Sequence, residues 1–127
     1  MKVRCDFVTN SSSSSFIIAV HKDADLTNEI KKFVNKNYHI IDNELKLSYS
    51  YYVKNGYTPE KLRDIAINYL EDELISPNLT LGDWKIFSGV ADNETDYGNY
   101  FLYSSRDYDS EYFKKVSQYE WRQEKEN

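Results

Sequence analysis

Cysteine, glycine and histidine are scarce in this chain of 127 residues, and each shortage excludes a class of protein. Cys5 is the single cysteine, which excludes an internal disulfide and favours a reducing compartment. Cys5, His21 and His39 lie at unrelated spacings, and the four glycines form no phosphate loop or nucleophile elbow. We therefore expect a protein that is not an enzyme, has no catalytic residues and holds no cofactor or metal.

Long apolar runs are also missing. The longest, Phe16–Val20, has five residues, whereas a helix that spans a bilayer needs roughly eighteen or more. Lys2 and Arg4 near the start are not followed by the apolar stretch and cleavage site of a secretory signal. These features predict a cytoplasmic protein that makes no contact with a membrane.

An excess of positive charge is also missing, and the second half of the chain is strongly acidic. The net charge is -5, of which residues 1–60 contribute +1 and residues 61–127 contribute -6. Binding to a nucleic-acid backbone gains its free energy largely from counterion release by clustered Lys and Arg. The sequence therefore argues against direct nucleic-acid binding and favours a basic partner, or solubility alone.

The hydrophobic content of 40% is enough for one core, so we expect a single domain over residues 1–127. Apolar spacing and turn signals predict strands at 15–21, 45–53, 84–91 and 99–105, the last two as a hairpin. The same signals predict helices at 28–37, with Thr27 as N-cap, at 59–75 and at 109–122. The result is an α+β fold, a mainly antiparallel or mixed sheet of about four strands with two to three helices packed on it.

Five serines, Ser11–Ser15, directly precede the first apolar stretch. We expect a Ser-rich turn at 9–15 whose hydroxyls bond to nearby backbone groups, and a frayed tail at 123–127. Alternatively, the run forms an anion-binding nest that holds a nucleotide phosphate while aromatic side chains stack on the base. The ligand-binding residues of this alternative are Arg4, Asn10, Ser11, Ser12, Ser13 and Arg106.

Residues 91–113, ADNETDYGNYFLYSSRDYDSEYF, interleave carboxylates with tyrosines. Spaced carboxylates can imitate a nucleic-acid backbone, and tyrosines bury interface area at low entropic cost. The alternative is a solvated hairpin turn whose tyrosines lie half in the core. The candidate partner-binding residues are Asp92, Glu94, Asp96, Tyr97, Tyr100, Tyr103, Asp107, Tyr108, Asp109 and Glu111.

The segment Asp6–Ile18, DFVTNSSSSSFII, resembles the opening of a group of small, mostly uncharacterised proteins of bacteria, phages and other mobile elements. These proteins begin with FV(S/T)NSSSSSF after one or two basic residues. The match includes Arg4, Phe7, Val8, Thr9, Asn10, Ser11–Ser15 and Phe16. The resemblance covers about the first eighteen residues and implies a phage or mobile-element origin, where small acidic domains often inhibit host defence.

Taken together, these observations predict a non-enzymatic counter-defence inhibitor of the anti-CRISPR-like kind, acting in the cytoplasm of the bacterial host. Its acidic, tyrosine-rich patch would occupy a basic surface of a host protein, such as a nuclease or another defence effector. One alternative is a protein that sequesters a nucleotide signal. Another is a structural or assembly domain whose serine segment docks into a neighbouring subunit of a homo-oligomer.

Overall fold

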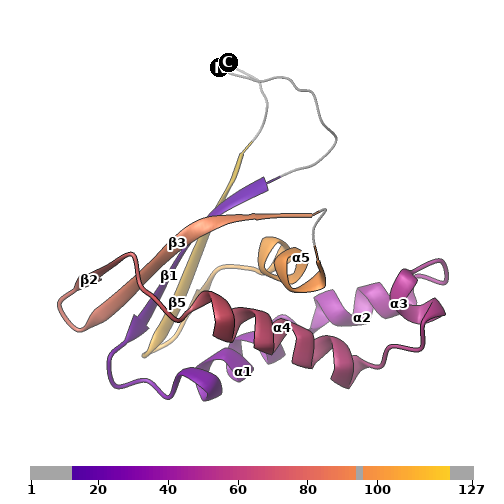
Figure 1. Ribbon diagram of the computed structural model, residues 1–127, viewed down its shortest axis with the longest axis horizontal. Helices are drawn as coiled ribbons and strands as arrows, with labels where there is room; N and C mark the ends of the chain where they lie inside the picture. Colours follow the sequence, from indigo (N-terminus) through magenta and orange to yellow (C-terminus); the bar gives the residue numbers. More distant parts are fainter. Residues whose placement is uncertain (1–12, 94–95, 121–127) are drawn as a thin grey trace.

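A five-stranded antiparallel sheet forms the centre of the structure, a computed structural model that describes residues 13–93 and 96–120 (Figure 1). The strands are β1 (Ser13–His21), β2 (Leu79–Leu81), β3 (Trp84–Asp92), β4 (Tyr108–Asp109) and β5 (Phe113–Glu120). Their order across the sheet is β2-β3-β1-β5-β4. The first strand in the chain is therefore the middle strand of the sheet, paired with β3 on one side and β5 on the other.

Helices cover one face of this sheet (Figure 1). They are α1 (Leu26–Lys36), α2 (Tyr38–Lys46), α3 (Tyr51–Lys54), α4 (Pro59–Glu73) and α5 (Tyr97–Ser104). The predicted α+β class is confirmed, with antiparallel pairing throughout the described sheet. The described residues form five strands and five helices, against the predicted four or so strands and two to three helices, because two segments predicted as strands are helical.

The core lies between the helices and the covered face of the sheet. In β1, Phe16, Ile18 and Val20 are buried because alternate side chains of a strand point to the same face. Phe33 of α1 is fully buried and packs on Phe113 of β5, with ring centroids 5.5 Å apart. The sheet and helix layers are thus joined by aromatic contacts near the middle of the domain.

The strands predicted at 15–21 and 84–91 and the helices predicted at 28–37 and 59–75 are confirmed within a few residues. Thr58 caps α4 as expected, because its side chain accepts a hydrogen bond from the backbone N–H of Lys61. The predicted cap of α1 is wrong. Asp25 accepts from Asn28 N–H, whereas the Thr27 hydroxyl donates to Glu71 at 2.7 Å.

The predicted strand at 45–53 is wrong, because this segment contains the end of α2, a turn and α3. Ser50 explains the difference. Its hydroxyl accepts from Tyr52 N–H and donates to Glu44 at 2.7 Å, so the segment satisfies its polar groups locally, without a neighbouring strand. Most of the face that the alternation predicted to be buried is exposed: Leu47, Tyr49, Tyr51 and Val53 all contact water, and Tyr49 is 72% exposed.

The last two predicted elements are also wrong, a strand at 99–105 and a helix at 109–122. Residues 97–104 form α5, because Asp96 caps it and Tyr97, Phe101 and Leu102 fall on one buried helical face. Residues 113–120 form β5 beside β1, where alternation buries Phe113 and Lys115. Helical spacing of apolar residues in this segment was overridden by pairing with a distant strand.

The serine run is not a turn where the structure describes it. Ser13, Ser14 and Ser15 belong to β1, and Ser14 is buried. The rest of the predicted turn at 9–15, including Ser11 and Ser12, lies outside the described residues, as does the predicted tail at 123–127.

Candidate functional site

The predicted partner-binding residues separate into two groups around α5. The first group is Asp92, Asp96, Tyr97 and Tyr100, and the second is Asp107, Tyr108, Asp109 and Glu111. Tyr103 lies between them in α5, and Glu94 is outside the described residues. The single acidic patch that the sequence predicts is therefore two surfaces.

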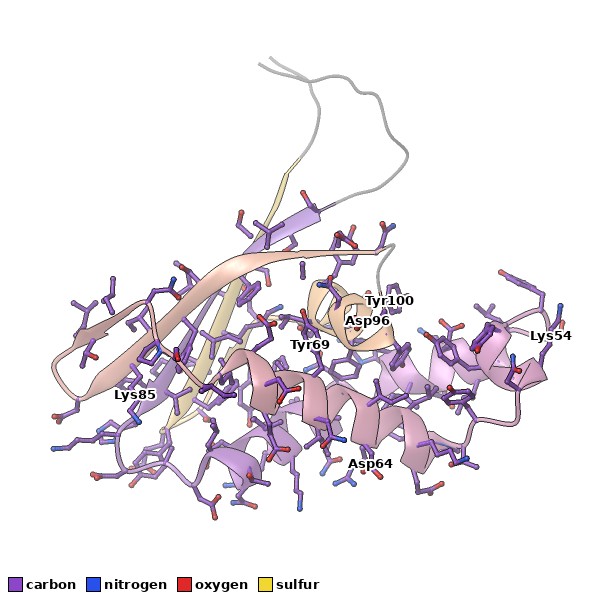
Figure 2. All side chains as sticks on the ribbon, viewed as in Figure 1. Lys54, Asp64, Tyr69, Lys85, Asp96 and Tyr100 are labelled. Atoms are coloured by element: carbon purple, nitrogen blue, oxygen red, sulfur yellow. The ribbon has the colours of Figure 1, made fainter. Side chains whose placement is uncertain are left out.

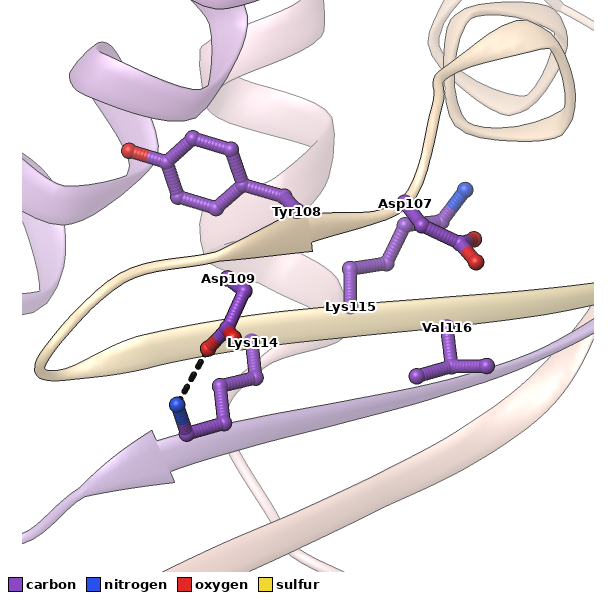
Figure 3. A pocket seen from close by; sticks show the side chains of 6 residues that line it. All are labelled: Asp107, Tyr108, Asp109, Lys114, Lys115 and Val116. Carbon is purple, nitrogen blue, oxygen red and sulfur yellow. Dashed lines mark hydrogen bonds and ion pairs between the residues drawn. The ribbon is translucent and has the colours of Figure 1, made fainter.

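The second group, residues 107–109 and 111, makes contacts with a lysine, a backbone N–H group and a core ring, and part of it is drawn in Figure 3. Asp109 forms an ion pair with Lys114, and Asp107 accepts a hydrogen bond from Ser117 N–H at 2.9 Å. The Tyr108 ring packs on Phe33 with centroids 5.4 Å apart, so Tyr108 belongs partly to the core. Lysines thus offset part of the negative charge at this end.

The first group gathers with residues from three other helices. Tyr69 lies at the junction of α4 and α5 together with Asp96 and Tyr100 (Figure 2). Its hydroxyl accepts a hydrogen bond from the Asn99 amide at 3.0 Å, and Asn99 in turn accepts from Asp92 N–H at 2.6 Å. We call the combined set the tyrosine–carboxylate surface. Its residues are Glu44, Tyr52, Tyr69, Glu73, Asp92, Asp96, Tyr97 and Tyr100.

Ring contacts hold the tyrosines of this surface together. Tyr97 is buried, and its ring centroid lies 5.1 Å from that of Tyr52 and 6.0 Å from that of Tyr100. Tyr52 also meets Tyr57 at 5.1 Å in an edge-to-face arrangement, which is the favoured geometry for aromatic pairs. Tyr97 is thus a buried anchor for the half-buried rings of Tyr52 and Tyr100.

The tyrosine hydroxyls respond to the carboxylates around them. Burial, followed by the charge of Glu73, raises the pKa of Tyr69 to about 12, although the Asn99 hydrogen bond acts in the opposite direction. Burial and then Glu44 raise the pKa of both Tyr52 and Tyr97. The surface therefore combines carboxylates with three phenols, those of Tyr52, Tyr69 and Tyr97, whose raised pKa keeps them protonated well above neutral pH.

Gly98 allows this surface to form. A Cβ atom added at Gly98 would lie closer than 3.0 Å to side-chain carbons of Tyr69, so only glycine lets α5 approach α4 so closely. In the sequence, Gly98 follows polar residues and indicates a turn. No local sequence pattern indicates that Glu44, Tyr52, Tyr69 and Glu73 belong to this surface. They reach it through contacts between helices that are far apart in the chain.

The alternative ligand-binding residues are only partly described. Ser13 lies in β1 opposite Asp92 and Glu120. Arg106 follows α5, where its backbone N–H donates to the buried Asn37 side chain at 2.9 Å. Arg4, Asn10, Ser11 and Ser12 lie outside the described residues. Within 13–93 and 96–120, no cluster of three His, Cys, Asp or Glu residues is suited to a metal ion.

Lys115 is a buried lysine that the sequence gives no reason to expect (Figure 3). Its ammonium group donates to the carbonyl oxygens of Ser105 at 2.9 Å and Leu102 at 3.3 Å, at the C-terminal end of α5. Burial lowers the pKa of Lys115 to about 8, and Asp107 opposes part of that shift. The side chain acts as a cap for α5 and has no exposed surface for a substrate.

The lowered pKa of Lys115 predicts that the free energy of unfolding rises between about pH 8 and pH 10. In that range the unfolded lysine, with a pKa of about 10.4, binds more protons than the folded one, so the free energy of unfolding increases with pH. Above about pH 10 the sign reverses, because unfolded tyrosines ionise while Tyr69 keeps its proton. Urea unfolding at a series of pH values measures both the rise in stability below about pH 10, the rising limb, and the fall above it.

The matched variants for this experiment are Lys115→Met and Lys85→Met, since Lys85 is exposed. We expect Lys115→Met to remove the rising limb and Lys85→Met to keep it. A wild-type stability that stays flat or falls from pH 8 to pH 9.5 would contradict the lowered pKa of Lys115.

Comparison with models of known protein families, with curated proteins and with solved structures gives no match in any of the three. In the described part of the chain, no helix is both long and apolar enough to cross a membrane. Information on function therefore lies in the geometry of the tyrosine–carboxylate surface and the chemistry of its residues.

Proposed function

We propose that this chain is a non-enzymatic protein-binding domain whose tyrosine–carboxylate surface occupies a basic surface of a partner protein. One observation supports it above the others: Asn99 is hydrogen-bonded to Tyr69 of α4 and to both Asp92 and Asp96. The rings of Tyr52, Tyr97 and Tyr100 pack against one another next to this link.

The chemistry of the surface suits arginine and lysine side chains of a partner. Carboxylates such as Glu73 and Asp96 would pair with guanidinium or ammonium groups, and guanidinium groups also stack on tyrosine faces. The protonated phenols of Tyr52 and Tyr69 would donate hydrogen bonds to carbonyl groups at the rim. Tyrosine loses little side-chain entropy on binding, which favours it at protein interfaces.

The nature of the partner follows from the resemblance in the first eighteen residues. A phage or mobile-element protein with an acidic surface of this kind would act as a counter-defence inhibitor of the anti-CRISPR-like class. Its target would be a host defence nuclease, whose basic nucleic-acid channel presents clustered Lys and Arg. In this proposal the surface takes the place of the phosphate backbone in that channel.

A pair of charge-matched double variants tests the proposal. Glu73→Gln with Asp96→Asn removes two negative charges from the tyrosine–carboxylate surface, and asparagine preserves the cap of α5. Asp109→Asn with Glu111→Gln removes two from the other group. The assay is DNA cleavage by a panel of purified bacterial defence nucleases, restriction and RNA-guided, with increasing inhibitor. For the inhibited nuclease, the first pair is expected to weaken inhibition roughly tenfold or more and the second less than about threefold.

Excess duplex DNA is expected to compete with the wild-type protein, because both would occupy the same channel. Equal effects of the two double variants would show that net charge, and not this surface, drives binding. Absence of inhibition across the panel would reject a nuclease as the target. Melting temperatures of all variants check that the fold is retained.

A further inference from the structure

The face of the sheet opposite the helices exposes aliphatic side chains, with Ser15 and Ser88 among them. Five aliphatic side chains on it have exposed fractions between 48% and 63%: Ile17, Leu79, Leu81, Val90 and Val116. The described helices pack on the other face (Figure 1).

Strand register places these side chains next to one another. Ile17 of β1 lies opposite Val116 of β5 on one side and Ser88 of β3 on the other. Further along β3, Ile86 and Trp84 lie opposite Leu79 and Leu81 of β2. We call this set the open sheet face: Ile17, Leu79, Leu81, Trp84, Ile86, Val90 and Val116. It is one continuous surface across four strands.

The size of this surface is suited to a protein interface. The five aliphatic side chains together expose apolar area on the order of 500 Å², which is at the upper end for a monomer that has no partner. With the polar side chains around it, a contact here would approach the roughly 800 Å² that each partner contributes to a standard interface.

The charges around the open sheet face suit a second copy of the same chain. Lys114 forms an ion pair with Asp109 and lies 5.5 Å from the Trp84 ring centroid, and Lys22 pairs with Asp83 at 3.4 Å. These pairs leave the rim close to neutral, although the chain as a whole has a net charge of -5. Two copies can therefore meet here without the like-charge repulsion that their acidic surfaces would cause.

Pairing through the sheet edges would use the outer sides of β3 and β5, which β2 and β4 cover only at residues 84–86 and 114–115. Such pairing would extend the sheet but leave the exposed aliphatic side chains uncovered, because side chains point out of the sheet plane. Face-to-face packing of two sheets, about 10 Å apart, instead uses the long central strands and their alternating side chains.

We propose that a second copy of this chain covers the open sheet face, forming a two-fold symmetric dimer with the helices outside. The same patch on both copies makes the contact, as in an isologous interface. The inference does not depend on the proposed function, because the tyrosine–carboxylate surface is built mainly on the helix layer.

Light scattering of the full chain during size-exclusion chromatography, over a range of concentrations, tests the proposal. We expect twice the chain mass of 15.0 kDa. Val90→Lys and, separately, Val116→Lys should each give a monomer, because a buried unpaired lysine in the contact is costly. The matched control is Ile75→Lys, since Ile75 is 72% exposed at the end of α4 and outside the open sheet face. Circular dichroism confirms that each variant is folded.

A wild-type monomer at all concentrations overturns the proposal. A dimer that survives both face variants, or that Ile75→Lys dissociates equally, overturns the location of the contact. Nuclease inhibition by monomeric Val90→Lys would show that the proposed function is separate from the dimer.

Discussion

Replacing Gly98 with alanine is expected to lower the free energy of unfolding by about 3 kcal/mol. The added methyl would lie closer than 3.0 Å to the Cβ and ring carbons of Tyr69, so either α5 must move away from α4 or the Tyr69 ring must leave its site. Both responses break the Asn99–Tyr69 hydrogen bond. Urea unfolding followed by circular dichroism measures the loss, and weaker nuclease inhibition should accompany it.

The matched control is Gly82→Ala in the turn between β2 and β3. Gly82 has a φ of +58°, so alanine is strained there, but its added Cβ would meet no atom within 4 Å. We expect a cost of about 1 kcal/mol from the backbone conformation alone. If Gly98→Ala is as stable as Gly82→Ala, the close approach of α5 to α4 is not as described.

Replacing Phe33 with alanine is expected to cost about 4 kcal/mol, the usual range for a fully buried phenylalanine. The ring lies between the layers and contacts Phe113 of β5 and Tyr108 of β4, with centroids 5.5 Å and 5.4 Å away. Its removal leaves a cavity where α1 meets the sheet. Thermal and urea unfolding measure the effect.

Tyr49→Ala is the control for Phe33→Ala, because Tyr49 is an aromatic residue exposed to water. We expect a change within about 0.5 kcal/mol there. Phe33→Leu should fall between the two, since it restores most of the volume. Comparable losses for the two alanine variants would argue that Phe33 is not in the core.

Local signals predicted an element correctly where they agreed with its tertiary setting. The helix at 59–75 has a capping Thr58, a proline at its first position and regular apolar spacing, and it buries Leu62, Ala66 and Leu70. The strand at 15–21 has buried alternate residues because it became the middle of the sheet. In both cases the sequence pattern and the neighbours favour the same backbone.

Elsewhere, contacts between distant segments decided the structure. Residues 113–120 have apolar spacing that suits a helix, yet pairing with β1 places them in the sheet and buries Lys115. Residues 97–104 have strong strand formers but follow the capping Asp96 and pack on α4 through Gly98. A single sequence without its contacts cannot rank these competing preferences.

The candidate site could be predicted in part for the same reason. Asp92, Asp96, Tyr97 and Tyr100 are near one another in the chain, so composition alone indicated them. Tyr69, about thirty residues earlier, joins them only because α4 packs against α5. The charges of Asp107 and Asp109 are offset by lysines, one of them directly paired with Asp109, that a linear pattern does not place.

The pairing of β1 with β5 determines the order in which this protein can fold during synthesis. Ser13 lies opposite Glu120, so the central ladder joins residues about a hundred positions apart. On the ribosome, β1 emerges early but waits for β5, and meanwhile its Phe16 and Ile18 have no completed core to enter. The helices can form as they emerge, whereas the sheet closes only after residue 120 has left the exit tunnel.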